Sequence, residues 1–192
     1  MDPILVLPFS ENMVVNELER KFPKKDGYSI LIPSTRQQKG FDLVVFNKKT
    51  NKCLTIQIKG SRTYNPTLPK RKSKKEKFKN YTWFNKFSIQ KGLADYYILF
   101  GLFITNPTNE IDSKRIKQTD WYDHILLVFS ENEMIRFLGG LKQKREDKSD
   151  TSFSFGFNDK KRVIQTRGSR EPIDFSDKIF SNRITDLKDK LK

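Results

Sequence analysis

The stretch FDLVVFNKKTNKCLTIQIKGSR, residues 41–62, constrains the fold more than any other part of the chain. It holds two apolar runs separated by the polar turn KKTNK, and this pattern predicts two neighbouring antiparallel strands. Side chains of a strand point alternately to opposite faces of its sheet. The second run therefore places Leu54, Ile56 and Ile58 on one face, which we expect to pack in the core.

Polar side chains occupy the opposite face of this second strand. Thr55, Gln57 and Lys59 share that face, so an amide and an ammonium group lie side by side. The turn brings Asp42, which follows a Gly-Phe bend at the start of the first strand, into the same neighbourhood. The alternatives are a solvated sheet face for Gln57 and Lys59, and a turn or capping role for Asp42.

These groups have the chemistry of a metal site. Asp42 and Gln57 offer oxygen ligands, and the main-chain carbonyls of the strand, that of Ile58 among them, add more. Mg²⁺ and Mn²⁺ prefer oxygen ligands. Lys59 next to such an ion would position or help to deprotonate a water molecule, or neutralise charge on a phosphate. The combination favours in-line attack on a phosphodiester bond, with Mg²⁺ as the expected cofactor and Mn²⁺ as a substitute.

A carboxylate in the first helix is a further candidate for the site. The sequence predicts that this helix begins at Ser10 as its N-cap. Glu11 shares the apolar face of the helix, which must pack on the sheet. Glu17 lies next to that face and Glu19 points further away, so both compete with Glu11. A first-turn glutamate that interacts with the helix dipole is the alternative interpretation of Glu11.

Three segments, ENMVVNEL, GFDLVVFN and TIQIKGSR, resemble motifs of the PD-(D/E)XK nuclease superfamily. The resemblance covers approximately residues 8–105. It is nearest to restriction-endonuclease-like and Holliday-junction-resolvase-like members with a Gln-x-Lys signature. It implies a restriction-endonuclease-like α/β fold, in which helices flank a mixed β-sheet. It also implies metal-dependent hydrolysis of phosphodiester bonds in nucleic acid, by an endodeoxyribonuclease in the first instance.

Residue by residue, the resemblance makes Asp42 the metal-binding aspartate, Lys59 the motif lysine and Glu11 the helix glutamate that assists at the metal. Gln57 stands where the superfamily usually has Glu or Asp, which removes one negative charge and implies weaker metal binding. Phe41 stands where the motif usually has proline. These departures leave a non-catalytic DNA-binding module of the same fold as one alternative. An RNA-directed nuclease is another, because nothing in the side chains separates DNA from RNA.

The charge of the chain indicates a polyanionic partner. Its 192 residues carry a formal net charge of +15, and so basic a surface attracts nucleic acid, here DNA in the first instance. Residues 70–79 are rich in Lys and Arg and predict a phosphate-binding loop, with a solvated loop as the alternative. Tyr81 and Trp83 are expected in the core, with stacking on unpaired bases as the alternative. The residues expected to contact nucleic acid are Ser61, Arg62, Lys70, Arg71, Lys72, Lys74 and Lys75.

Composition excludes several classes of site. The chain has one cysteine, Cys53, and one histidine, His124, so an internal disulfide, a His-rich zinc site and a zinc finger are ruled out. Cys53 is expected to be a buried, inert thiol. No apolar stretch reaches the roughly 20 residues that a membrane-spanning helix needs, so we expect a cytoplasmic protein without a membrane partner. The resemblance also implies a homodimer, because cutting both strands of DNA requires two active sites.

The rest of the chain predicts one mixed α/β domain over residues 1–192. Its core is expected at about 8–140, followed by a hairpin and a helix at about 151–192. Residues 83–94 are predicted to form a short helix. Residues 95–104 are apolar almost throughout, which is typical of a central strand buried on both faces.

Overall fold

The computed structural model of the chain describes residues 3–34, 40–63, 78–104, 122–144, 146 and 148–192. Within these residues the chain forms three α-helices and ten strands, and the strands make two five-stranded sheets. This confirms the predicted α/β class.

The first sheet has the strand order β1-β2-β3-β6-β7. Its first three strands, β1 (Tyr28–Leu31), β2 (Leu43–Asn47) and β3 (Lys52–Gly60), form an antiparallel meander. Strand β6 (Tyr96–Ile104) pairs in parallel with β3 and antiparallel with β7 (Tyr122–Ser130). The predicted pair of antiparallel strands and the mixed sheet are thereby confirmed.

The second sheet has the order β10-β9-β8-β5-β4 and is antiparallel throughout. Its strands are β4 (Arg62–Thr63), β5 (Asn80–Asn85), β8 (Ser152–Phe157), β9 (Ile164–Arg167) and β10 (Ile173–Asp174). The predicted C-terminal hairpin is confirmed as β8 and β9. Because β4 follows β3 after a single residue, the chain passes directly from the first sheet into the second.

The helix predicted for residues 83–94 is wrong. Strand β5 covers the start of this segment, pairs with β8, and buries Thr82 and Phe84. Tyr81 and Trp83 were expected in the core but are half-buried on the opposite face of β5. The burial of β5 has a period of two residues, which identifies a strand and not a helix.

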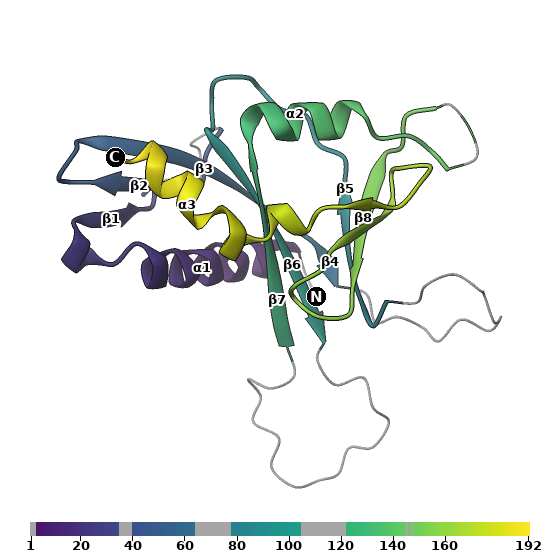
Figure 1. Cartoon of the computed structure of the whole chain (residues 1–192), viewed down its shortest axis with the longest axis horizontal. Coiled ribbons are helices and arrows are strands. Elements are labelled where there is room, and N and C mark those ends of the chain that lie inside the picture. The colour runs from purple at the N-terminus through teal and green to yellow at the C-terminus, as the bar shows by residue number, and fades with distance from the viewer. Residues whose placement is uncertain (1–2, 35–39, 64–77, 105–121, 145, 147) are drawn as a thin grey trace, which may run out of the picture.

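The helices lie on both sides of the first sheet (Figure 1). They are α1 (Pro3–Lys21), α2 (Glu131–Gly139) and α3 (Phe180–Lys190), with two short 3₁₀ helices, η1 (Lys24–Asp26) and η3 (Ser176–Lys178). Helices α1 and α3 pack against one face, and α2 packs with the second sheet against the other. The C-terminal helix is thereby confirmed. Helix α1 begins at Pro3, so the prediction of Ser10 as its N-cap is wrong; Ser10 is buried in the helix interior.

Strands β6 and β7 are buried on both faces. Along β6, Tyr96, Ile98 and Phe100 belong to the core beneath α1 and α3, whereas Tyr97 and Leu99 belong to the core shared with the second sheet. This confirms the prediction of a central strand. It also explains how the two layers of the structure are joined. One layer packs against one face of these two strands, and the other layer packs against the opposite face.

Cys53 is exposed near the start of β3, so the prediction of a buried thiol is wrong. It lies next to the hairpin turn, where the first residues of β3 are uncovered. As for membranes, no helix within the described ranges has the length and apolar character that crossing a bilayer requires.

We expect Gly101→Ala to destabilise the protein. A Cβ at Gly101 in β6 would clash with Cγ2 of Thr82 in β5, so the two sheets would have to move apart. Overpacking of this kind costs about 1–3 kcal/mol, and urea denaturation would measure it. The control is Gly139→Ala at the C-terminal end of α2, where a Cβ meets nothing within 4 Å, so little change in stability is expected. Equal effects of the two changes would contradict this account.

Candidate functional site

The candidate site lies where β2 begins and β3 approaches its end. Asp42 directly precedes β2, and its N–H donates to the carbonyl of Ile56 at 2.8 Å. Its carboxylate oxygen Oδ2 accepts the N–H of Ile58 at 2.6 Å. In an antiparallel ladder this N–H would bond to a main-chain carbonyl of the neighbouring strand. The Asp42 side chain therefore takes the place of the missing acceptor.

A bend before Asp42 explains why that acceptor is missing. Gly40 has a φ of +104°, a conformation that favours glycine. A Cβ on Gly40 would lie 2.5 Å from the Cβ of Leu93, so the chain turns closely against the segment before β6. The predicted bend ahead of Asp42 is confirmed, and the register of β2 with β3 ends at the pair Leu43 and Ile56.

The main-chain carbonyl of Ile58 points to the same open edge. In a strand, the N–H and C=O of one residue point to the same side, and successive residues alternate. The N–H of Ile58 is directed at Asp42, whereas the N–H of Ser61 is directed at Phe100 of β6. The Asp42 carboxylate and the Ile58 carbonyl therefore lie at one edge of β3, beyond the start of β2.

Gln57 and Lys59 project from the face of β3 opposite to α1. Burial alternates along the strand, and these two side chains are half-buried between fully buried neighbours. This confirms that they share a face. The Lys59 ammonium lies 5.2 Å from the centroid of the Phe87 ring, and that ring stacks on Tyr97, the register partner of Gln57. Aromatic side chains thus shield part of this face.

Asp42 and Lys59 are both desolvated. Burial raises the pKa of Asp42 above its ordinary value of 3.8, although the hydrogen bond from Ile58 and the charge of Lys59 act in the opposite direction. Burial lowers the pKa of Lys59 below 10.5, and the charge of Asp42 partly offsets this. Neither group forms an ion pair with any residue in the described part of the chain. An acid and an amine perturbed in this way are typical of functional sites.

The competing carboxylates of α1 are directed elsewhere. Glu17 accepts a hydrogen bond from Arg20 at 2.9 Å, and its Oε1 lies 3.6 Å from Nε2 of His124 on β7. Strand β6 separates β7 from β3 in the sheet. Glu19 is exposed to solvent. Glu17 and Glu19 are therefore directed away from the candidate site.

Glu11 is half-buried in the interior of α1. Because α1 begins at Pro3, Glu11 is not in the first turn, and the helix-dipole alternative is wrong. The ring of Phe9, two residues earlier, meets Phe100 edge-on at 6.3 Å, and Phe100 is the register partner of Gly60. This turn of α1 therefore crosses the sheet near the end of β3, on the face opposite to Gln57 and Lys59.

The residues expected to contact nucleic acid have different positions. Ser61 is buried, donates its N–H to Phe100 at 2.8 Å and accepts the N–H of Leu102 at 3.2 Å, so it joins β3 to β6. Arg62 begins β4, where its register partner is Trp83. The remaining members of the set lie outside the described residues: Lys70, Arg71, Lys72, Lys74 and Lys75.

The oxygen donors fit a weakly held hard cation. No three side chains of His, Cys, Asp or Glu form a metal-holding group within the described ranges. What the geometry brings to the end of β3 is one carboxylate from Asp42, one amide from Gln57 and one main-chain carbonyl from Ile58. Mg²⁺ is often bound by one or two carboxylates while it keeps several waters. A single negative charge in this set predicts low affinity.

Sequence reasoning missed the segment between β5 and β6 as a wall of the site. Phe87 lies over Lys59, and Leu93 packs against Gly40. Phe87 and Ile89 are apolar residues two apart in a polar stretch, and this was the available signal. The prediction of a helix over the segment obscured it.

Comparisons with known proteins identified no relative of this chain. A scan against protein-family models, a search of curated proteins and a search of solved structures each gave no match to this chain. The class defined by the structure is an α/β protein with one mixed and one antiparallel sheet.

We expect Lys59→Met to stabilise the protein. The ammonium group is partly desolvated and has no ion-pair partner among the described residues, so its charged form opposes folding. Because the folded-state pKa is lowered, this cost is complete below that pKa and disappears as the pH rises to 10.5. At neutral pH the gain in Tm should be about 2–4 °C, equivalent to about 1 kcal/mol for a chain of this size. The gain should shrink in alkaline buffer.

Lys52→Met is the matched control, because Lys52 lies on the same strand with its side chain exposed. It should leave Tm unchanged in thermal melts followed by circular dichroism. If Lys59→Met lowered Tm instead, the contact of the ammonium with the Phe87 ring would outweigh its desolvation.

Proposed function

We propose that the chain is a metal-dependent nuclease of the PD-(D/E)XK type that hydrolyses phosphodiester bonds in DNA. One observation carries the proposal. The β2–β3 hairpin places the carboxylate of Asp42, the amide of Gln57 and the carbonyl of Ile58 at the open end of β3, next to the desolvated amine of Lys59. Carboxylate, neutral oxygen donors and an amine with a lowered pKa are the groups that metal-assisted phosphodiester hydrolysis uses.

The topology supports a restriction-endonuclease-like fold. Helix α1 crosses one face of the sheet, a three-strand meander follows, and β6 lies parallel to β3. A mixed sheet flanked by helices is the arrangement that the resemblance implies. One departure concerns the helix expected between β3 and β6. In the described residues, β4 and β5 occupy this connection and belong to the second sheet.

Each residue has a separate role in the proposed mechanism. Asp42, Gln57 and Ile58 would hold Mg²⁺ or Mn²⁺, and such an ion would supply Lewis-acid chemistry at the phosphate. The lowered pKa of Lys59 increases the fraction of its amine that is uncharged, which is the form that accepts a proton, and its charged form stabilises negative charge on the phosphate. The resemblance gives Glu11 of α1 an assisting role at the metal.

A non-catalytic DNA-binding module is the second candidate. The favouring observation is that the Asp42 carboxylate already accepts the N–H of Ile58, which is a purely structural role. The absence of a three-acid group from the described residues points the same way. The net charge of +15 supports nucleic acid as the partner in either case.

A plasmid-nicking assay in Mg²⁺ and then Mn²⁺ tests the first candidate. Asp42→Asn keeps an oxygen that can accept the N–H of Ile58 but removes the charge, and Lys59→Ala removes the amine. We expect each change to lower the rate by at least about 100-fold, because the first removes the charged ligand of the metal and the second removes a group that can transfer protons. Lys52→Ala, at an exposed position on β3, should nick DNA at the wild-type rate.

The outcomes of this assay separate the candidates. Equal nicking by all four proteins would place the activity elsewhere or in a contaminant. If none of them nicks DNA, while wild type and Lys59→Ala shift DNA to the same extent in a gel, the binding module is favoured. A substrate panel of DNA and RNA under the same conditions then shows which nucleic acid is cleaved.

Gln57→Glu should strengthen metal binding. It adds the carboxylate that the superfamily usually has here, and affinity for hard cations rises with the charge of the ligands. The Mg²⁺ concentration for half-maximal activity should fall about tenfold, and calorimetric titration with Mg²⁺ provides a second measurement. Asn16→Asp adds the same charge at an exposed position on α1 and should change neither quantity. An unchanged Mg²⁺ requirement in Gln57→Glu would show that this side chain does not bind the metal.

A further inference from the structure

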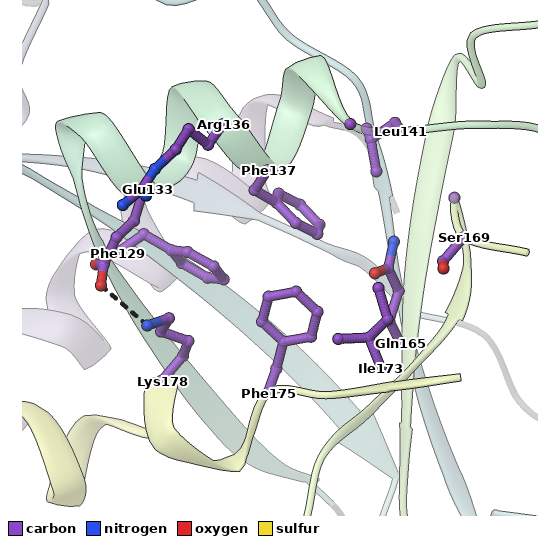
Figure 2. A pocket seen from close by; sticks show the side chains of 12 residues that line it. Phe129, Glu133, Arg136, Phe137, Leu141, Gln165, Ser169, Ile173, Phe175 and Lys178 are labelled. Atoms are coloured by element: carbon purple, nitrogen blue, oxygen red, sulfur yellow. Dashed lines mark hydrogen bonds and ion pairs between the residues drawn. The ribbon is translucent and has the colours of Figure 1, made fainter. Parts of the chain in front are cut away.

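A pocket of about 370 Å³ lies between α2, β9 and the segment around η3. It shares no residue with the candidate site described above. Phe129, Phe137 and Phe175 supply aromatic rings to its lining, and Figure 2 shows Gln165 opposite them. A pocket of this size is within the range of small-molecule sites, roughly 300–1,000 Å³. It can therefore hold a compact organic ligand.

A buried amide faces the interior of this pocket. Gln165 is 3% exposed, and its Nε2 donates to the main-chain carbonyl of Arg167 at 3.0 Å. Its Oε1 is drawn on the side of the aromatic rings (Figure 2). A side-chain amide oxygen accepts hydrogen bonds, so a ligand N–H is the group that this oxygen would bind.

The pocket also has an available cation. Glu133 is neutralised, because its two oxygens lie 2.9 Å from Lys178 and 2.9 Å from Arg183. Arg136 is exposed, and its Nε–H donates to the carbonyl of Asn132 at 3.4 Å, a long and weak hydrogen bond. The other N–H groups of its guanidinium can therefore bind an anion. Arginine binds phosphate groups well because its donors match phosphate geometry.

We propose that this pocket binds a nucleotide. The base packs on the rings of Phe137 and Phe175, an N–H on its edge donates to Oε1 of Gln165, and the phosphate meets Arg136. Flat aromatic rings stack on aromatic side chains with little preference for sequence, and every common base carries an N–H on its pairing edge. The same chemistry is offered by a free nucleotide and by an unstacked base in a nucleic-acid chain.

Calorimetric titration of the full-length protein tests this site. The ligands are AMP, GMP, CMP and UMP, ribose 5-phosphate as a ligand without a base, and short single-stranded oligonucleotides. Arg136→Gln should weaken nucleotide binding about tenfold, as loss of a charged hydrogen bond does. Ile173→Trp should abolish it, because Ile173 is a 46% exposed residue of the pocket lining and the larger side chain would fill the space. Lys161→Gln, an exposed position, should bind like wild type.

Each outcome decides the question. Mononucleotide binding that depends on Arg136 and Ile173 assigns a free nucleotide, and oligonucleotide binding alone with the same dependence assigns an unstacked base. The proposal is overturned if ribose 5-phosphate binds as tightly as the nucleotides, if the variants bind like wild type, or if no ligand binds. Asp42 and Lys59 stay intact in all variants, so the result does not depend on whether the chain cleaves DNA.

Discussion

The burial of β6 and β7 on both faces is the constraint on which the rest of the structure depends. Their alternate side chains fill two cores at once, one beneath α1 and α3 and one shared with the second sheet and α2. Such strands cannot slip by one residue, because slippage would exchange the two sets of side chains. The parallel pairing of β3 with β6 is fixed in consequence, and so is the point at which β3 extends past β2.

The candidate site combines a structural task with unfavourable solvation. Asp42 completes the hydrogen bonding of β3, yet burial opposes its charge, and Lys59 is a half-buried amine beside an aromatic ring. Local arrangements that lower stability are concentrated at functional sites in natural proteins. A sheet selected for stability alone would have apolar side chains here. The retention of polar groups at this edge is the physical reason for regarding it as a site.

The sequence predicted those features that depend on local periodicity. The alternation around Gln57 and Lys59 gave the correct faces of β3, and the apolar run from Tyr96 gave a central strand. The failures involve partners distant in sequence. Strand β5 is recognisable through its pairing with β8, about seventy residues later, and the short run WFNKF fits either the strand period or the helix period.

The face of the sheet that Glu11 approaches depends on which side α1 covers, and helix periodicity alone does not contain that information. The residues that line the proposed nucleotide pocket come from α2, β9 and the segment around η3, which are separate in sequence. No spacing in the sequence therefore predicted the pocket.

The exposure of Cys53 gives the molecule a natural attachment point for probes. It is the single thiol of the chain and lies near the outer end of β3. At the rise of an extended strand, about 20 Å of the same rigid element separate it from Lys59. A fluorophore or spin label on this sulfur would therefore be clear of the candidate site but within range of it. Energy transfer or paramagnetic relaxation could then follow the arrival of a metal ion or a labelled oligonucleotide without any cysteine being removed first.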